Sequence, residues 1–232
     1  MRFLCTLAAC ALRISAIVLQ TGLLLTLGAL LAGSAEALTT TYTDSSTFLG
    51  ALPGLPTTED FESLTAQDPV GTLGDITFSE SVPGESLMVT DLYDQTTSEG
   101  ALSLGLDNLD EALQDGDVLS LAFASPVNAL GLFVITSDAA VADEIQLVTL
   151  VGTSYNSATE ETILGDGGIA YFVGLISDTS FSSATLDFAD DGETNFVYNV
   201  DDIVTAIPEP GTFVLLGAAL LGLTLMGRRR LR

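Results

Sequence analysis

The sequence predicts an all-β protein, an antiparallel β-sandwich of the jelly-roll kind. Between Leu38 and Ile207, apolar residues recur with period two in short runs, and turn-forming residues separate these runs. A period of two places one face of a strand on a core, and about ten to twelve short strands with regular turns are typical of sandwiches. Helix-like spacing is confined to two short stretches of this region. The fold class therefore follows from the periodicity and the turn spacing.

The strands are expected in regular order along this region. Alternation is clearest in three runs, led by Leu119, Leu121 and Phe123, by Ala184, Leu186 and Phe188, and by Phe196, Tyr198 and Val200. Turns are expected where glycine follows proline or an acidic residue, since these residues suit turn conformations. The other predicted strands are 38–43, 58–64, 75–79, 87–92, 101–106, 127–136, 144–151, 161–164 and 169–176.

Two short helices are expected beside the strands. The first covers Ser45–Leu52, with Asp44 or Ser45 as its N-cap, because a side-chain oxygen there can accept a free backbone N–H of the first turn. The second is a weaker pattern over Asn108–Leu113. Neither is long, so the prediction remains all-β.

The residue inventory of the predicted sandwich excludes several kinds of chemistry. The chain has no histidine, both cysteines fall at Cys5 and Cys10, and all six basic residues lie outside 38–206. A zinc site of the Cys/His type, a Ser-His-Asp triad, a Cys-His pair, a lysine Schiff base and a P-loop lysine are therefore excluded there. Nucleic acid is excluded as a partner because no side chain could neutralise phosphates.

The predicted sandwich is strongly acidic. It holds all of the 31 acidic residues except Glu36 and Glu209. Like charges at this density repel one another in the compact state, so stability depends on screening by salt or on bound divalent cations. Disorder is not expected, because apolar residues are frequent and patterned.

The N-terminal segment, residues 1–37, predicts a secretory signal peptide. Arg2 and Arg13 give a positive start, an uncharged stretch follows from 14 to 35, and Ala35 and Ala37 form an A-x-A cleavage site. Signal peptidase is thus an expected partner during export. The alternative is an uncleaved anchor, because the apolar stretch is long enough to span a membrane.

The C-terminal segment, residues 207–232, joins a turn motif, an apolar run and a basic end. The uncharged residues 211–227 would span roughly 25 Å as a helix, at the short end of what crosses a bilayer. Arginines directly behind such a helix are held on the cytoplasmic side. The residues that carry the pattern are Pro208, Glu209, Pro210, Arg228, Arg229 and Arg230.

This tail resembles the PEP-CTERM sorting signal of bacterial exported proteins. The resemblance implies recognition by exosortase, an anchor in the inner membrane before processing, and a final place at the cell surface or in the extracellular matrix. It covers about a tenth of the chain and implies no ligand. The alternative is a plain turn in front of a permanent membrane anchor.

Carboxylates at the two ends of the predicted sandwich suggest a calcium site. An early and a late strand of a jelly roll lie side by side, which would bring Glu59 and Glu62 close to Asp201 and Asp202. Calcium takes six to eight oxygen ligands, which carboxylates and carbonyls supply. The arrangement is similar to jelly-roll carbohydrate-binding modules, in which an early Glu and a late Asp hold a structural calcium. The alternative is a pair of solvated strand ends.

A second acidic stretch, Asp107–Asp117, lacks the spacing of an EF-hand and is interpreted as a polar hairpin loop.

Three functions remain open. The first is a non-catalytic structural or adhesive protein, the second a lectin-like module that binds extracellular polysaccharide, with or without calcium, and the third a glycosidase that uses two carboxylates. A cluster of exposed tyrosines would favour the second. The first is the prediction, and with it the absence of catalytic residues.

Overall fold

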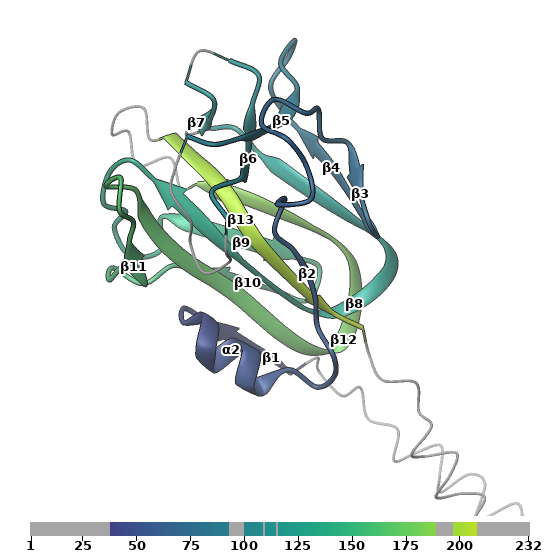
Figure 1. Cartoon of the computed structure of the whole chain (residues 1–232). Coiled ribbons are helices and arrows are strands. Elements are labelled where there is room, and N and C mark those ends of the chain that lie inside the picture. The colour runs from purple at the N-terminus through teal and green to yellow at the C-terminus, as the bar shows by residue number, and fades with distance from the viewer. Residues whose placement is uncertain (1–37, 93–99, 109, 115, 189–196, 208–232) are drawn as a thin grey trace, which may run out of the picture. The chain divides into compact units, whose positions relative to one another are not determined.

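Strands dominate the part of the chain that the computed structural model describes, residues 38–92, 100–108, 110–114, 116–188 and 197–207 (Figure 1). The predicted all-β, sandwich-like fold is confirmed. Across these residues no helix has the length and apolar character needed to cross a membrane. The predicted signal helix and transmembrane helix lie outside the described residues.

The strands pair in an antiparallel arrangement with one short helix beside them. Their bounds are β1 (Thr39–Tyr42), β2 (Thr57–Glu59), β3 (Thr72–Leu73), β4 (Ile76–Glu80), β5 (Leu87–Thr90), β6 (Ser103–Leu106), β7 (Leu113–Gln114), β8 (Leu119–Thr136), β9 (Ile145–Thr149), β10 (Gly152–Tyr155), β11 (Thr162–Ile163), β12 (Ile169–Phe188) and β13 (Val197–Ala206), and the helix is α2 (Ser45–Ala51).

Two long, bent strands, β8 and β12, connect the two layers of the sandwich (Figure 1). They pair with each other on both sides of a register shift that falls at Ile176–Ser183 of β12. The first half of β8 also pairs with β4, and the second half of β12 with β9. The other halves lie between β13 and β1. The bend lets one continuous sheet fold over itself and enclose a core.

The main core lies between the two layers. Alternate residues of β8, Leu119 and Leu121 before the bend and Leu130 and Leu132 after it, belong to one buried apolar cluster with Val200 of β13. This is the period-two pattern of the sequence, since only every second side chain of a strand points to the core. The cluster holds the layers together through apolar burial.

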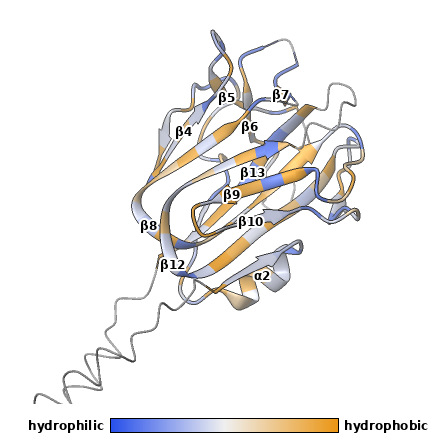
Figure 2. Ribbon diagram, turned by 180° about the vertical axis from the view of Figure 1, so that it is seen from behind, coloured by the Kyte–Doolittle hydropathy of each residue, from blue (hydrophilic) through white to orange (hydrophobic). Residues whose placement is uncertain are grey.

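A second apolar cluster lies under α2, on the outer face of one layer (Figure 2). Phe48 of α2 is fully buried and contacts Phe172 with ring centroids 5.2 Å apart. Gly131 and Gly174 are paired across β8 and β12 beneath these rings. A Cβ on Gly131 would lie 2.5 Å from Cζ of Phe172 and 2.8 Å from Cε1 of Phe48. The two glycines therefore leave the space that seats the helix.

Helix α2 begins with the predicted N-cap. Oδ1 of Asp44 accepts the backbone N–H of Thr47 at 2.7 Å, and the Ser46 hydroxyl donates to the same oxygen at 2.9 Å. Hydrogen bonding by the Thr47 side chain, the Thr47 backbone N–H and the Ser46 hydroxyl holds the pKa of Asp44 below its ordinary value of 3.8. A lowered folded-state pKa means that the ionised cap stabilises the fold above the unfolded-state pKa and that this stabilisation is lost as pH falls through the lowered value.

We therefore expect Asp44→Ala to lower the melting temperature at pH 7 and to have a smaller effect below pH 3.8. Asp44→Asn is the matched control, because its side-chain oxygen can cap at any pH. Thermal melts of the three proteins from pH 7 to pH 3 measure this. An Asp44→Ala deficit that stays constant over the range would contradict the role of the carboxylate.

The described domain begins and ends at the same end of the sandwich. Thr40 pairs with Ile176, Ile176 with Ala129, and Ala129 with Ala206, so the first and last strands lie in one row across β12 and β8. Three strand spacings amount to roughly 14 Å. We call this end the base, defined by Leu38 and Ile207, and the opposite end the distal end.

The structure corrects several predicted boundaries. The runs before and after Pro126 form one strand, and so do the predicted strands 169–176 and 184–188. The predicted strand 58–64 stops at Glu59, and β10 was not predicted. Asn108–Leu113 is not helical in its described residues, because Glu111 has φ 51° and the chain turns into β7.

Candidate functional site

A hollow of about 470 Å³ lies at the distal end of the sandwich. Three segments form its wall: the loop before β3, the start of β5 and the connection after β6. Most of the side chains that line it carry oxygen or amide groups. The lining residues are Gln67, Pro69, Ser86, Leu87, Met88, Asp107, Asn108 and Glu111.

Asn108 organises the connection after β6. Its side-chain amide donates to the carbonyl oxygen of Ala112 at 2.9 Å and to the carboxylate of Glu85 at 3.1 Å. Its Oδ1 accepts the backbone N–H of Asp110 at 3.0 Å. These bonds tie the connection to the turn before β5 and fix one wall of the hollow.

Glu111 anchors the same connection to two strands, β5 and β13. Its carboxylate accepts the hydroxyl of Thr90 in β5 at 2.8 Å, and its carbonyl oxygen accepts the side-chain amide of Asn199 in β13 at 3.0 Å. Gly105 of β6 allows this approach, because a Cβ there would lie 2.1 Å from the carbonyl oxygen of Glu111. The positive φ of Glu111 is therefore held by tertiary contacts.

Two polar atoms near this anchor lack a hydrogen bond. Oδ1 of Asn199 and Oγ of Ser103 are buried and, within the described chain, have no partner. Ser103 pairs with Thr90 across β5 and β6. Both side chains can accept a hydrogen bond, so a water molecule or a donor group of a ligand would suit them.

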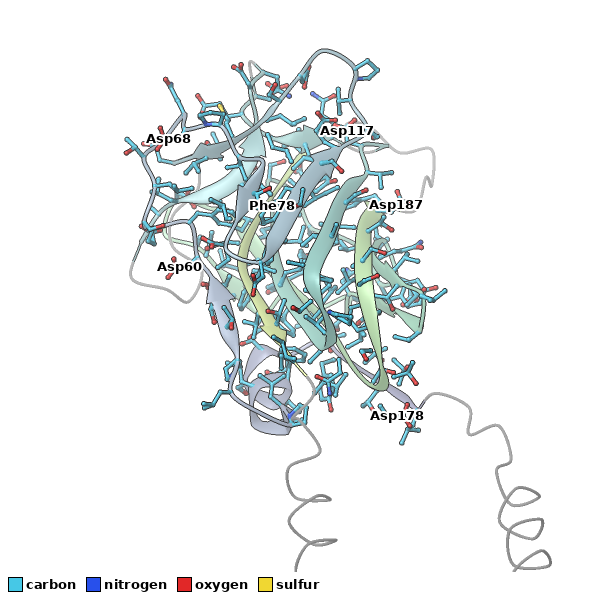
Figure 3. All side chains as sticks on the ribbon, turned by 90° about the vertical axis from the view of Figure 1, so that its right-hand side faces the viewer. Asp60, Asp68, Phe78, Asp117, Asp178 and Asp187 are labelled. Carbon is cyan, nitrogen blue, oxygen red and sulfur yellow. The ribbon has the colours of Figure 1, made fainter. Side chains whose placement is uncertain are left out.

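The distal end is the acidic end of the domain. Its connections carry many of the described acidic residues, whereas the turns at the base carry Asp75 and Asp178. Figure 3 shows Asp178 at the base and Asp117 and Asp187 further toward the distal end. No basic residue between Leu38 and Ile207 offsets this negative charge. The distal acidic residues include Asp68, Glu85, Asp107, Asp110, Glu111, Asp117, Asp138, Asp143, Glu144, Glu160, Glu161 and Asp166.

The structure brings the early and late acidic segments of the predicted calcium site to neighbouring strands. Glu59 of β2 pairs with Ile203 of β13. Glu62 lies beyond β2, and its carboxylate accepts the backbone N–H of Leu102 at 2.8 Å. Gly100 makes room for it, since a Cβ there would lie 1.7 Å from Cδ of Glu62.

Asp201 and Asp202 lie in a bulge of β13 and are both buried. Asp202 has φ 47°, and its backbone N–H donates to Oδ1 of Asp201 at 2.7 Å. Across the described residues, no three acidic side chains are grouped closely enough to hold a metal ion. The adjacency of the two segments was thus correctly expected, while calcium binding by Glu59, Glu62, Asp201 and Asp202 stays a prediction.

The tyrosines do not form an exposed cluster among the described residues. Tyr171 and Tyr198 are buried, Tyr42 is half-buried against Phe48, and Tyr155 is exposed. The hydroxyl of Tyr171 accepts the backbone N–H of Ala140 at 2.9 Å, and burial raises the pKa of this phenol above 10.0. Tyr93 lies outside the described residues.

The sorting and cleavage residues also lie outside the described part: Ala35, Ala37, Pro208, Glu209, Pro210, Arg228, Arg229 and Arg230. The sequence did not predict the hollow; the stretch 107–117, interpreted as a polar hairpin loop, supplies Asp107, Asn108 and Glu111 of its wall. Gln67 and Ser86, which complete its wall, carry no sequence pattern that marks them.

Comparisons with known proteins give a family for the tail. Residues 206–230 match the family described as the PEP-CTERM protein-sorting motif. No curated protein matches the chain.

Solved structures add a weak likeness. The catalytic domain of a GH87 alpha-1,3-glucanase, in complex with tetrasaccharides, is similar with a TM-score of 0.32 and 17% identity over 61% of this chain. A second structure of such a domain, also with tetrasaccharides, has the same TM-score at 18% identity. This chain spans 29% and 30% of the lengths of those two chains.

The family match covers the turn motif, the apolar run and the three arginines that follow it, in the order described above. It supports export, a membrane-anchored precursor and processing by exosortase. Residues 206–230 of the chain thus carry a PEP-CTERM protein-sorting motif, the signal by which exosortase processes exported proteins.

Proposed function

We propose that this protein is a non-catalytic surface or exopolysaccharide-matrix protein whose β-sandwich acts as a structural or adhesive element. The observation that carries the proposal is the sorting motif, which follows β13 after a single residue, Ile207. The sandwich is therefore the domain that the sorting motif would direct to the cell surface or matrix. Between Leu38 and Ile207 no histidine, cysteine, lysine or arginine is available for catalysis. A catalytic pair would have to be built from carboxylates alone, which leaves a glycosidase as the catalytic alternative.

A carbohydrate-binding role is the second candidate, and the distal hollow favours it. Carboxylate, amide and hydroxyl side chains in its wall are groups that can bond to sugar hydroxyls. The wall includes no aromatic side chain on which a sugar ring could stack. Binding there would therefore depend on hydrogen bonds.

A glycan array with the fragment 38–207, with and without calcium, separates these roles. No binding to any arrayed glycan in either condition supports the structural role, and binding of a defined sugar supports the lectin-like role. Hydrolysis of any arrayed glycan would contradict both and favour a glycosidase.

If a sugar binds, we expect Asp107→Asn to weaken binding about tenfold or more, because a hydrogen bond to a charged group contributes about 1.5–3 kcal/mol. Asp138→Asn is the matched control: it removes the same charge at the same end, outside the wall of the hollow. Titration calorimetry measures both. Equal losses in the two variants would place binding outside the hollow.

The calcium prediction has its own test. We expect millimolar calcium to raise the melting temperature by several degrees more than equal magnesium, because magnesium demands tighter octahedral geometry. Glu62→Ala or Asp202→Ala should remove this increment. Equal effects of the two ions would reduce the cation response to screening of an acidic surface.

A further inference from the structure

The base of the sandwich differs from the rest of its surface in two ways. Exposed large apolar side chains gather there: Leu55 is 95% exposed, Leu150 92%, Leu38 73% and Ile207 51%. Asp75 and Asp178 lie in the turns of the base, and Asp91 begins the β5–β6 connection that opens toward this end. An exposed apolar end with few charges is unusual on so acidic a domain.

Strand pairing places these apolar residues together at the base. Thr57 pairs with Thr205, so Leu55 and Ile207 continue past the same point of β2 and β13. Leu150 lies in the turn between β9 and β10, and the hydroxyl of Thr39 donates to the carbonyl oxygen of the next residue, Val151, at 2.9 Å. This bond joins the turn to the start of β1, directly after Leu38.

A small hollow adds to the apolar character of the base. Its volume is about 50 Å³, and its wall includes Leu73, Phe123 and Ile207. Ile207 is the last residue that the structure describes, and the uncharged run 211–227 begins four residues later in the sequence. The four Cα–Cα steps from Ile207 to Gly211 can span at most roughly 14 Å.

We propose that the base rests on the outer surface of the lipid bilayer in the membrane-anchored precursor. The inference rests on the anchor that the sorting motif implies. The short connection keeps the base within reach of the bilayer, and the four apolar side chains enter the boundary between headgroups and acyl chains. The acidic distal end, with the hollow, then faces away from the membrane.

Charge supports this orientation over its reverse. The distal end, with its many acidic residues, would lose hydration and be repelled by any anionic lipid. The base presents fewer acidic residues, and apolar side chains of an interfacial surface gain by burial about 5–10 Å deep. The short connection alone would allow the domain many orientations on the bilayer. The different composition of the base and the distal end favours one of them.

The absence of tryptophan from the chain makes the test direct. The full chain is reconstituted into phosphatidylcholine vesicles as Leu55→Trp or as Val141→Trp, which reports from the exposed connection after β8 at the distal end. Vesicle flotation measures anchoring, and phosphatidylcholine brominated in its acyl chains measures contact. Because an interfacial side chain is buried about 5–10 Å deep, near the brominated acyl chains, we expect the emission of Leu55→Trp to fall and that of Val141→Trp to stay unchanged.

Each result is decisive. Flotation with quenching of Leu55→Trp alone supports the proposal. Flotation with both variants quenched alike, or neither, overturns the contact and leaves the anchor intact. A chain that does not float overturns the anchoring step on which the inference rests. Leu150→Trp, at another fully exposed position of the base, repeats the test if Leu55→Trp does not fold.

Discussion

Replacing Phe48 with alanine should lower the free energy of unfolding by about 3–5 kcal/mol, because the ring is fully buried and its removal leaves a cavity. The ring contacts Phe172 and Tyr42, with centroids 5.2 and 5.6 Å apart. It also covers Gly131 and Gly174, which have no side chains and so leave room for the ring.

Leu49→Ala is the matched control for Phe48→Ala. Leu49 is the next residue of α2 and is exposed, so its truncation should change stability by less than about 0.5 kcal/mol. Urea titrations of both variants give the two values. Equal destabilisation would mean that α2 contributes to stability through the helix propensity of its residues and not through the burial of Phe48 over Gly131 and Gly174.

Replacing Glu209 with alanine should leave export intact and stop release from the inner membrane. Deleting Arg228–Arg232 should have the same outcome. The reason is that the turn motif is the element that the resemblance assigns to exosortase, while the basic end sets the orientation of the apolar run. Fractionation of inner membrane, outer membrane and medium measures the effect. Because uncleaved chains keep their anchor, the released fraction should fall close to zero.

Two controls distinguish loss of sorting from loss of folding. Asp178→Ala removes a carboxylate at the base without touching the motif and should be released normally. Replacing the arginines at 228–230 with lysines keeps the positive charge, so membrane orientation should be retained. Normal release of Glu209→Ala would contradict the assignment of this tail as a processed signal.

The strands were predictable wherever burial on one face dictates a period of two. The alternation of Leu119, Leu121 and Phe123 needs no tertiary information, and the N-cap at Asp44 follows from local hydrogen bonding. Continuity through Pro126 was not predictable, because proline lacks an N–H for the ladder and normally ends a strand. Here it lies where the register shifts and the sheet bends.

Other features depend on contacts between distant segments. β10 has no apolar alternation, and its pairing with β9 makes it a strand. The turn at Glu111 is held by Thr90 and Asn199, which lie 21 and 88 residues away. For the acidic segments, sequence reasoning placed Glu59 beside the late strand but could not foresee that Glu62 would bond to Leu102.

The row of pairs from Thr40 to Ala206 has a consequence for how this fold can be reused. Ends about 14 Å apart can be joined by about five residues, given a reach of about 3.3 Å per residue. Such a domain can be inserted into a loop of another protein, or its chain can be closed and reopened at an exposed turn such as Gly84, without separating β8 from β12. The sandwich can thus be transferred between proteins as a unit, and its sorting signal can be exchanged without changing the residues of the core.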